Sequence, residues 1–212
     1  MKIVNNFNFD IVILGAGANG SHFFRNLLQD MATYGSRLQL TRILIADGDR
    51  TEKKNLDNQL FDEEDIGEFK VTALAERYGE HYGIDILAVP EYITDCEMLD
   101  RLFANDGRFK ILIGCVDNNR TRQLFNDYFN HVDDLLYIDA GIEGVMVKEE
   151  IDENIPSHQR DKMIIGSGFS GQVVVGFKAK GEVILQPLCE LYPNVLTDTE
   201  SVFPTGRQMM SA

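Results

Sequence analysis

The sequence has few cysteines, an excess of acidic over basic residues, and no long apolar run. Its 212 residues contain three cysteines, which lie far apart and form no C-x-x-C pair. This usage fits a reducing cytoplasm and predicts no structural zinc site. A formal net charge of -14 argues against nucleic-acid binding by bulk electrostatics. No apolar run approaches a membrane span, and the first residues lack a signal-peptide pattern. We therefore expect a cytoplasmic protein with neither a nucleic-acid nor a membrane partner.

A chain of this length is expected to form one domain, over residues 1–212, with enough residues to bury a sizeable core. Near its start, an apolar run over Ile11–Leu14 leads into the pattern G-x-G-x-x-G, formed by Gly15, Gly17 and Gly20. The first glycine allows a tight turn, the second lets a phosphate approach the backbone, and the third lets the next helix pack on the strand. The alternative is a strand-to-helix turn with no ligand.

Apolar runs alternate with amphipathic segments through the first two thirds of the chain. The expected strands are 11–14, 42–46, 84–89, 110–114 and 135–139. The expected helices are 19–34, 67–82, 95–104 and 120–130. This alternation predicts a doubly wound, largely parallel sheet with right-handed crossovers. Residues 50–66 are polar and predicted to be irregular.

The last third of the chain has a different pattern. Residues 148–165 are mostly polar, and residues 166–171 are expected to form a flexible loop. Two strands, 172–177 and 182–186, are predicted to form a hairpin, and the tail from Pro187 shows no clear helix. The predicted fold class is therefore α/β, with a Rossmann-like parallel sheet extended by antiparallel strands near the C-terminus.

Acidic residues follow several of the predicted strands, where ligands bind in open α/β sheets. Asp47 is placed to accept hydrogen bonds from ribose hydroxyls, although a solvated turn carboxylate would look the same. Asp117 could hold Mg²⁺ beside phosphates, or could cap the helix that begins near Arg120. We expect Gly15, Asp47, Asp117 and Asp139 to lie along one edge of the sheet.

Several linked motifs resemble the ThiF/MoeB/HesA superfamily, the bacterial relatives of ubiquitin-activating enzymes. The resemblance covers about residues 10–141, and Ser170–Val175 is similar to a later strand of the family. Within the superfamily the chain looks closest to the ThiF-related proteins of PRTRC gene cassettes. The motifs are Gly15-Ala-Gly-Ala-Asn-Gly20-Ser21, Asp47-Gly-Asp49, Asn55-Leu-Asp-Asn-Gln59, Asp65-Ile-Gly-Glu-Phe-Lys70 and Cys115-Val-Asp-Asn118.

The resemblance implies an enzyme that binds ATP and Mg²⁺ and adenylates a C-terminal carboxylate. The carboxylate would belong to a ubiquitin-like or sulfur-carrier-like protein, and the enzyme would be a homodimer, with Val173, Val175 and Phe177 as candidates for the shared surface. By motif position, the glycines Gly15, Gly17 and Gly20 would line the nucleotide, Asp47 would bind ribose, Asn55, Asn58 and Lys70 would face the phosphates, and Asp117 would hold Mg²⁺. For Lys70, a solvated lysine in the first helical turn is the alternative.

The chain departs from the family pattern at three places. Asn58 stands where the family has an arginine on the phosphates, and an asparagine carries no charge. Many members begin with an extra helix, which we expect to be absent or greatly shortened here. The family sheet is usually followed by a C-terminal helix, and the sequence shows no obvious one, so truncation at the C-terminus is one expectation. Nearby cations could compensate for Asn58, and Cys189 is a weak candidate for a thioester-forming nucleophile. The compensating candidates are Arg50, Lys53, Lys54 and Arg122.

Three functions follow from these patterns. The first is ATP-dependent activation of a small carrier protein. The second is a non-catalytic nucleotide-binding scaffold of the same fold. The third is an NAD(P)-dependent oxidoreductase, which would explain the glycine pattern but neither Asn55 and Gln59 nor Asp117.

Overall fold

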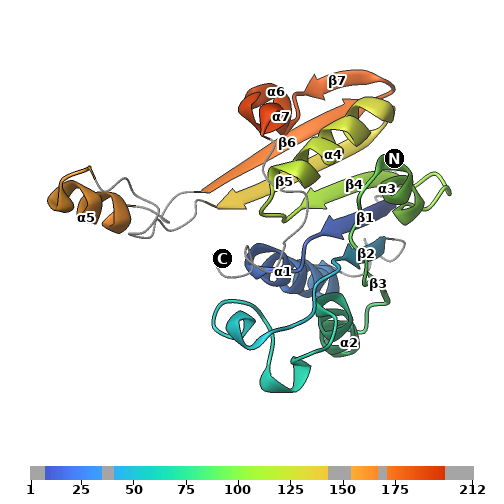
Figure 1. The fold of residues 1–212 in the computed structure, drawn as a ribbon. Coiled ribbons are helices and arrows are strands. Elements are labelled where there is room, and N and C mark those ends of the chain that lie inside the picture. The colour runs from blue at the N-terminus through green and yellow to red at the C-terminus, as the bar shows by residue number, and fades with distance from the viewer. Residues whose placement is uncertain (1–7, 35–40, 143–153, 167–170, 199–212) are drawn as a thin grey trace.

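The computed structural model describes residues 8–34, 41–142, 154–166 and 171–198. They form one seven-stranded sheet in the order β3-β2-β1-β4-β5-β6-β7 (Figure 1). Strands β1 to β5 are parallel, and β6 and β7 continue the sheet with antiparallel pairing. The predicted fold class is therefore confirmed. The strands are β1 Phe9–Leu14, β2 Arg42–Ala46, β3 Ile86–Val89, β4 Phe109–Gly114, β5 Leu135–Ile142, β6 Gly171–Ala179 and β7 Glu182–Leu185.

Helices cover both faces of the sheet. In Figure 1, α1 and α2 lie on one side of the strands, and α3 and α4 lie on the other. None of the helices among the described residues is long and apolar enough to cross a membrane. The α-helices are α1 Ala18–Tyr34, α2 Lys70–Tyr82, α3 Cys96–Leu102, α4 Asn119–His131, α5 Ser157–Ile165, α6 Leu188–Leu191 and α7 Asn194–Thr197; two 3₁₀ turns are η2 Lys53–Asn55 and η3 Glu63–Asp65.

The central strand β1 is apolar throughout its second half because each of its faces meets a helical layer. Ile11 and Ile13 are buried in the cluster that contains residues of α1 and α2. Val12 and Leu14 are buried in the cluster that contains residues of α3 and α4. Successive side chains of a strand point to opposite faces, so a strand covered on both sides needs an unbroken apolar run.

The loops after β1, β2 and β4 leave the sheet at the same edge, which we call the carboxyl edge. Leu14 is in register with Ala46 on one side and with Gly114 on the other. The strand order reverses at β1, so the crevice between β1 and β4 is the topological switch point, where such sheets bind ligands. Asp47 and Asp117 follow β2 and β4, and the structure therefore places both at the carboxyl edge, as predicted.

Asp139 is level with the carboxyl ends of β4, β1 and β2, as predicted, but its own strand does not end there. Strand β5 continues to Ile142, so Asp139 lies within the strand, opposite Gly114 of β4 and Val174 of β6, and it is fully buried. The long antiparallel strand β6 supplies backbone partners beyond the point where β4 ends. This pairing extends β5 past the residue at which its apolar run stops.

Helix boundaries near glycine and proline also differ from the prediction. Helix α2 begins at Lys70 rather than at residue 67, because Gly67 has φ +92° and Phe69 is extended. The tail contains two one-turn helices, α6 after Pro187 and α7 after Pro193, which are too short to show a helical periodicity. Part of the polar segment forms α5, which stands away from the sheet in Figure 1 and buries none of its side chains.

The predicted hairpin between β6 and β7 is confirmed. Lys180 and Gly181 have φ values of 51° and 77°, and two successive left-handed residues suit the twist of a two-residue hairpin. Predictions for the chain before residue 8, for residues 148–153, for most of the loop over 166–171 and for the tail beyond residue 198 lie outside the described residues.

Candidate functional site

The glycine-rich turn packs tightly at two of its glycines and is open at the third. Gly15 has φ +95°, and a Cβ on it would lie 2.5 Å from the carbonyl oxygen of Cys115. A Cβ on Gly20 would lie 1.9 Å from the carbonyl oxygen of Gly15. Beside Gly17, in contrast, no atom of the described residues lies within 4 Å of the Cβ position, apart from the adjoining backbone. The first and third glycines thus make the turn compact, and the second leaves room for a ligand at the N-terminus of α1.

Asp47 connects the glycine turn to the loop after β2. Its Oδ2 accepts a hydrogen bond of 2.6 Å from the backbone N–H of Ala16, and its Oδ1 accepts one of 2.8 Å from Asp49 N–H. Burial and then the neighbouring Asp49 charge raise the pKa of Asp47, while the charge of Lys70 acts in the opposite direction. The alternative of a freely solvated carboxylate is wrong. Each oxygen still has a second lone pair for a ligand hydroxyl.

Lys70 is a buried lysine with a defined partner. Its side chain is 7% exposed, and its Nζ lies 3.0 Å from Oδ2 of Asp49. Its backbone N–H also donates to the Asp49 carbonyl oxygen at 3.0 Å. The alternative of a solvated first-turn lysine is therefore wrong. A chain of hydrogen bonds runs from Ala16 through Asp47 and Asp49 to Lys70, so the cation and the glycine turn belong to one polar cluster.

Sequence reasoning missed Tyr92, whose hydroxyl donates to Oδ1 of the same Asp49 carboxylate. Tyr92 belongs to the segment after β3, and β3 ends beside the start of the Asp47 loop, where Asp47 N–H donates to the Val89 carbonyl oxygen. No motif contains Tyr92. The sequence contained one signal for Tyr92: it lies three residues after the end of β3, and a residue at that point is expected near the carboxyl edge.

Asp117 is exposed and does not cap a helix. The cap of α4 is Asn118, whose Oδ1 accepts hydrogen bonds of 2.8 Å from the N–H and from the hydroxyl of Thr121. The capping alternative for Asp117 is therefore wrong. Among the described residues, no group of three or more His, Cys, Asp or Glu side chains could hold a metal ion. One exposed carboxylate, such as that of Asp117, suits Mg²⁺ that takes its other ligands from phosphates and water.

The segment around Asn55 folds onto the start of α1. Asn55 is buried, and its Oδ1 accepts a hydrogen bond of 2.8 Å from Glu52 N–H, which closes the turn η2. Leu60 N–H donates to the hydroxyl oxygen of Ser21 at 3.3 Å. The buried Oε1 of Gln59 accepts no hydrogen bond from the described residues, and a bound ligand or a water molecule with a donor would satisfy it. Asn58 is exposed.

The ThiF family model matches residues 5–194 of the chain. The chain belongs to the ThiF family. Membership of the ThiF/MoeB/HesA superfamily, predicted from the motifs, is confirmed. No curated protein matches the chain.

Crystal structures of E. coli MccB have a similar fold. For MccB with ATP, the identity is 25% and the TM-score 0.52, over 66% of this chain and 40% of that chain. For MccB with succinimide, the identity is 25% and the TM-score 0.51, over 74% and 47%. The microcin C7 biosynthetic enzyme MccB in complex with N-formylated MccA is 22% identical with a TM-score of 0.51, over 74% and 49%. The chain thus spans less than half of these MccB chains.

In this ThiF family chain, two of the cations that could replace the missing arginine already have partners. Arg122 donates to Asp139 at 3.2 Å, to Asn119 at 3.1 Å and to the Val116 carbonyl oxygen at 2.8 Å. The guanidinium of Arg50 lies 3.8 Å from the centre of the Phe69 ring and donates to the carbonyl oxygen of residue 67 at 2.7 Å. Neither is therefore free to turn toward a phosphate without losing these contacts.

The two buried cysteines of this ThiF family chain, Cys115 and Cys189, are poor nucleophiles. Cys189 is 1% exposed in α6, and its Sγ lies 3.8 Å from the Arg122 carbonyl oxygen. Burial, and then nearby carboxylates, raise the pKa of Cys189 to about 11. Burial raises the pKa of Cys115 to about 12. Because the thiolate is the reactive form, neither cysteine is prepared for thioester formation at neutral pH.

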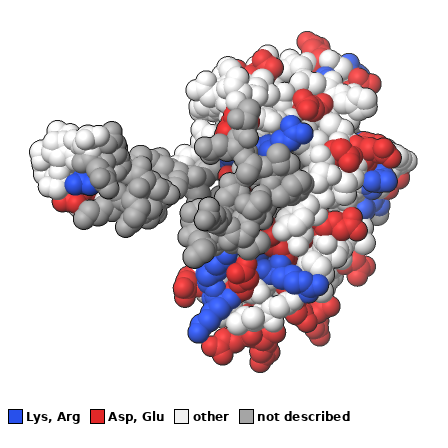
Figure 2. Space-filling view, in the orientation of Figure 1, with Lys and Arg blue, Asp and Glu red and all other residues white. Residues whose placement is uncertain are grey.

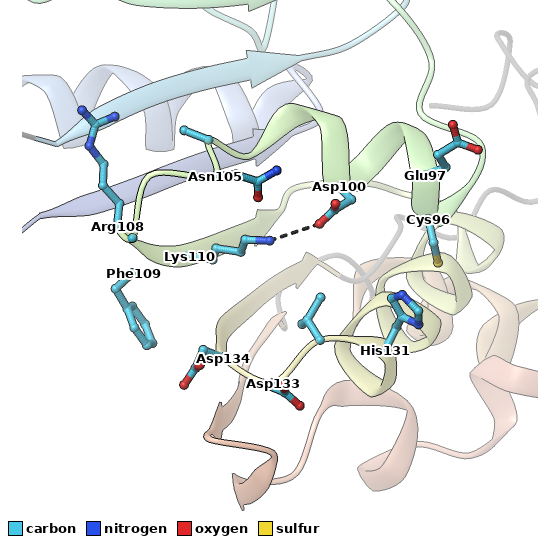
Figure 3. A pocket seen from close by; sticks show the side chains of 13 residues that line it. Cys96, Glu97, Asp100, Asn105, Arg108, Phe109, Lys110, His131, Asp133 and Asp134 are labelled. Carbon is cyan, nitrogen blue, oxygen red and sulfur yellow. Dashed lines mark hydrogen bonds and ion pairs between the residues drawn. The ribbon is translucent and has the colours of Figure 1, made fainter.

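A hollow of about 850 Å³ lies away from the predicted site (Figure 3). Its lining comes from α3, the loop between α3 and β4, the start of β4, the end of α4 and the turn before β5. The start of β4 and the turn before β5 lie at the edge opposite the carboxyl edge, which we call the amino edge. Lys110 and Asp100 form an ion pair of 3.1 Å inside it. It contains none of the predicted site residues. Acidic side chains are spread over the face shown in Figure 2, with fewer basic ones among them. An anionic ligand would therefore depend on local positive groups, such as Lys70 at the carboxyl edge.

Proposed function

We propose that this protein binds ATP with Mg²⁺ at the carboxyl edge and adenylates the C-terminal carboxylate of a peptide or of a small ubiquitin-like or sulfur-carrier-like protein. The observation that carries the proposal is the hydrogen-bonded cluster that joins the glycine turn to Lys70 through Asp47 and Asp49. The cluster contains residues of three of the family motifs, and its glycine turn borders the crevice between β1 and β4. Membership of the ThiF family and the MccB crystal structure with ATP support it.

The residues at this edge suit a nucleotide. The open space beside Gly17 and the N-terminus of α1 would receive a phosphate. Asp47 would accept from the ribose, and Lys70 and Asn55 would face the phosphates. Asp117 would hold Mg²⁺, which would neutralise charge on the phosphate oxygens. Asn58, which stands at the position of the family's arginine, is exposed. Its amide could donate a hydrogen bond to a phosphate but would supply no charge.

The proposed reaction is a displacement at the α-phosphorus. A carboxylate oxygen of the substrate forms the new P–O bond, the bond from the α-phosphorus to the bridging oxygen breaks, and pyrophosphate leaves with that bonding pair. The products are an acyl-adenylate and pyrophosphate. Lys70 supplies positive charge near the leaving group, and preorganised charge of this kind contributes most of the catalysis in phosphate chemistry.

The substrate class follows from two sources. The motifs resemble those of enzymes that activate carrier proteins, and the MccB structures include one in complex with N-formylated MccA. We also propose a homodimer. Val173 on β6 is 69% exposed and is free to line a shared surface, whereas the Phe177 ring packs against that of Phe109. Sedimentation at micromolar concentration tests this, and a monomer alone would contradict it.

The direct test is ATP–pyrophosphate exchange with candidate carrier proteins and peptides that end in a free carboxylate. Exchange that needs such a substrate and Mg²⁺, and that loses its Mg²⁺ dependence in Asp117→Ala, would support the proposal. Binding of ATP with no exchange for any substrate would favour the scaffold, which the replacement of the arginine by Asn58 makes the second candidate. Preference for NAD(P) over ATP would reject both.

A further inference from the structure

Tyr92 is positioned at the nucleotide edge by a glycine and a carboxylate. A Cβ on Gly48 would lie 2.5 Å from the Tyr92 ring, so the ring rests directly on the backbone of the loop after β2. The Tyr92 hydroxyl donates to Oδ1 of Asp49, and Lys70 Nζ donates to Oδ2 at 3.0 Å. One carboxylate thus accepts from a cation and from a phenol on different oxygens.

The ion pair between Asp49 and Lys70 competes with the proposed ligand. Lys70 is the cation expected on the phosphates, and in this structure its ammonium is paired with a carboxylate. The Asp49 side chain is 32% exposed, so a triphosphate can reach the same side of the cluster. When the ammonium turns from Asp49 to a phosphate, the carboxylate loses its cation and is left near additional negative charge, which is unfavourable in a partly buried site.

We propose that Tyr92 is a positioning residue of the nucleotide site, which holds and stabilises the Asp49 carboxylate while Lys70 exchanges it for the triphosphate. The inference rests on the proposed function. It predicts that Tyr92 matters for ligands with a polyphosphate chain and hardly for nucleoside monophosphates. Burial and the hydrogen bond to Asp49 raise the pKa of Tyr92, which keeps its hydroxyl a neutral donor at neutral pH.

The test is Tyr92→Phe, which keeps the ring on Gly48 and removes only the donor. We expect the Kd of ATP to rise about fivefold, as for loss of one hydrogen bond, and the Kd of AMP to change less than about twofold. In an Asp49→Asn background, Tyr92→Phe should have no effect, because the neutral amide needs no compensation. Tyr128→Phe, which removes a hydroxyl from Asp100 at the amino edge, is the matched control and should leave the ratio of the two Kd values unchanged.

Equal losses of ATP and AMP binding, or the same loss in the Asp49→Asn background, would overturn the positioning role. If the wild-type protein binds neither nucleotide, the proposed function fails, and acetylation of Lys70 by acetic anhydride in the nucleotide-free protein tests separately whether Tyr92 stabilises the Asp49 carboxylate. Tyr92→Phe should then slow this acetylation at least twofold, since Asp49 would depend more on the ammonium. An unchanged rate would reject the role of Tyr92.

Discussion

Two clusters of the same composition, each a lysine, an aspartate and a tyrosine, lie at opposite edges of the sheet. At the amino edge, Asp100 accepts from Lys110 at 3.1 Å and from the Tyr128 hydroxyl at 2.9 Å, both on Oδ1. At the carboxyl edge, Asp49 accepts from Lys70 and from Tyr92 on separate oxygens.

Their surroundings differ in the position of the tyrosine and in what lies beside the carboxylate. Tyr128 is fully buried in α4, whereas Tyr92 is 42% exposed. The amino-edge cluster lies next to the ends of helices. The carboxyl-edge cluster is hydrogen-bonded, through Asp47, to a glycine turn with open space beside it. The two lysine–aspartate pairs have similar lengths, so it is the glycine turn beside the carboxyl-edge pair that makes this pair the candidate for ligand binding.

The largest difference between the two clusters is expected when the lysine of each is removed. Lys70→Ala should lower ATP–pyrophosphate exchange about a hundredfold, because one preorganised charge near the phosphates is lost. Lys110→Ala, which breaks a pair of nearly the same length, should change exchange less than about twofold. Both variants are measured beside wild type under saturating substrate. Similar losses in the two would show that the lysines act only through stability.

A second test adds a charge at each edge. Asn58→Arg restores the cation of the family pattern at the carboxyl edge. Because Arg50 and Arg122 have other partners, we expect it to raise exchange about tenfold, as one added charge-assisted contact would. Asn105→Arg at the amino-edge hollow is the matched control and should have no effect. A wild-type rate that Asn58→Arg leaves unchanged would indicate that another cation, such as the exposed Lys53, already compensates.

Substituting the two tyrosines should lower the stability of the protein by different amounts, because they differ in burial. Tyr128→Phe removes a buried hydroxyl that bonds to Asp100, and should lower the free energy of unfolding by about 1 kcal/mol. Tyr92→Phe removes a hydroxyl at the surface, and should cost less than about 0.5 kcal/mol. Urea unfolding followed by circular dichroism measures both. A larger loss for Tyr92→Phe would mean that the carboxyl-edge cluster is mainly structural.

The smallest expected effect concerns Cys189. Because its pKa is raised to about 11, the thiol stays protonated through neutral pH and forms thiolate only as the pH approaches that value. Cys189→Ser should leave pyrophosphate exchange within about twofold of wild type. Iodoacetamide at pH 8 should modify this cysteine in urea but not in the folded protein, as mass spectrometry of the peptides would show. Rapid labelling of the folded protein would contradict the burial argument.

Local patterns were sufficient for much of the fold and for part of the site. The apolar run of β1 followed by the glycines predicted a strand, a tight turn and a helix, and these elements are present. Asp47 and Asp117 were placed at one edge because each follows a buried strand, and carboxyl ends of parallel strands share an edge. The register of Leu14 with Ala46 and Gly114 confirms that these strands end at the same edge.

Other features depend on contacts between distant parts of the chain. Asp139 was expected to end its strand, but β6, more than thirty residues later, pairs with β5 beyond this residue, and Asp139 is buried. The buried state of Lys70 depends on Asp49, 21 residues earlier. Arg122 was a candidate cation until the fold paired it with Asp139.

The sequence by itself determined the order of strands and helices, the compact glycine turn and the identity of the family, because periodicity, glycine spacing and motif order are local properties. Only the tertiary structure decided which polar groups remain available. Burial requires partners for charged and polar groups, and the fold assigned Lys70 and Tyr92 to Asp49, Arg122 to Asp139, and Asn118 to the cap of α4. Within the part of the chain that the structure describes, Gly17 and Asp117 remain accessible, and the proposed nucleotide would bind there.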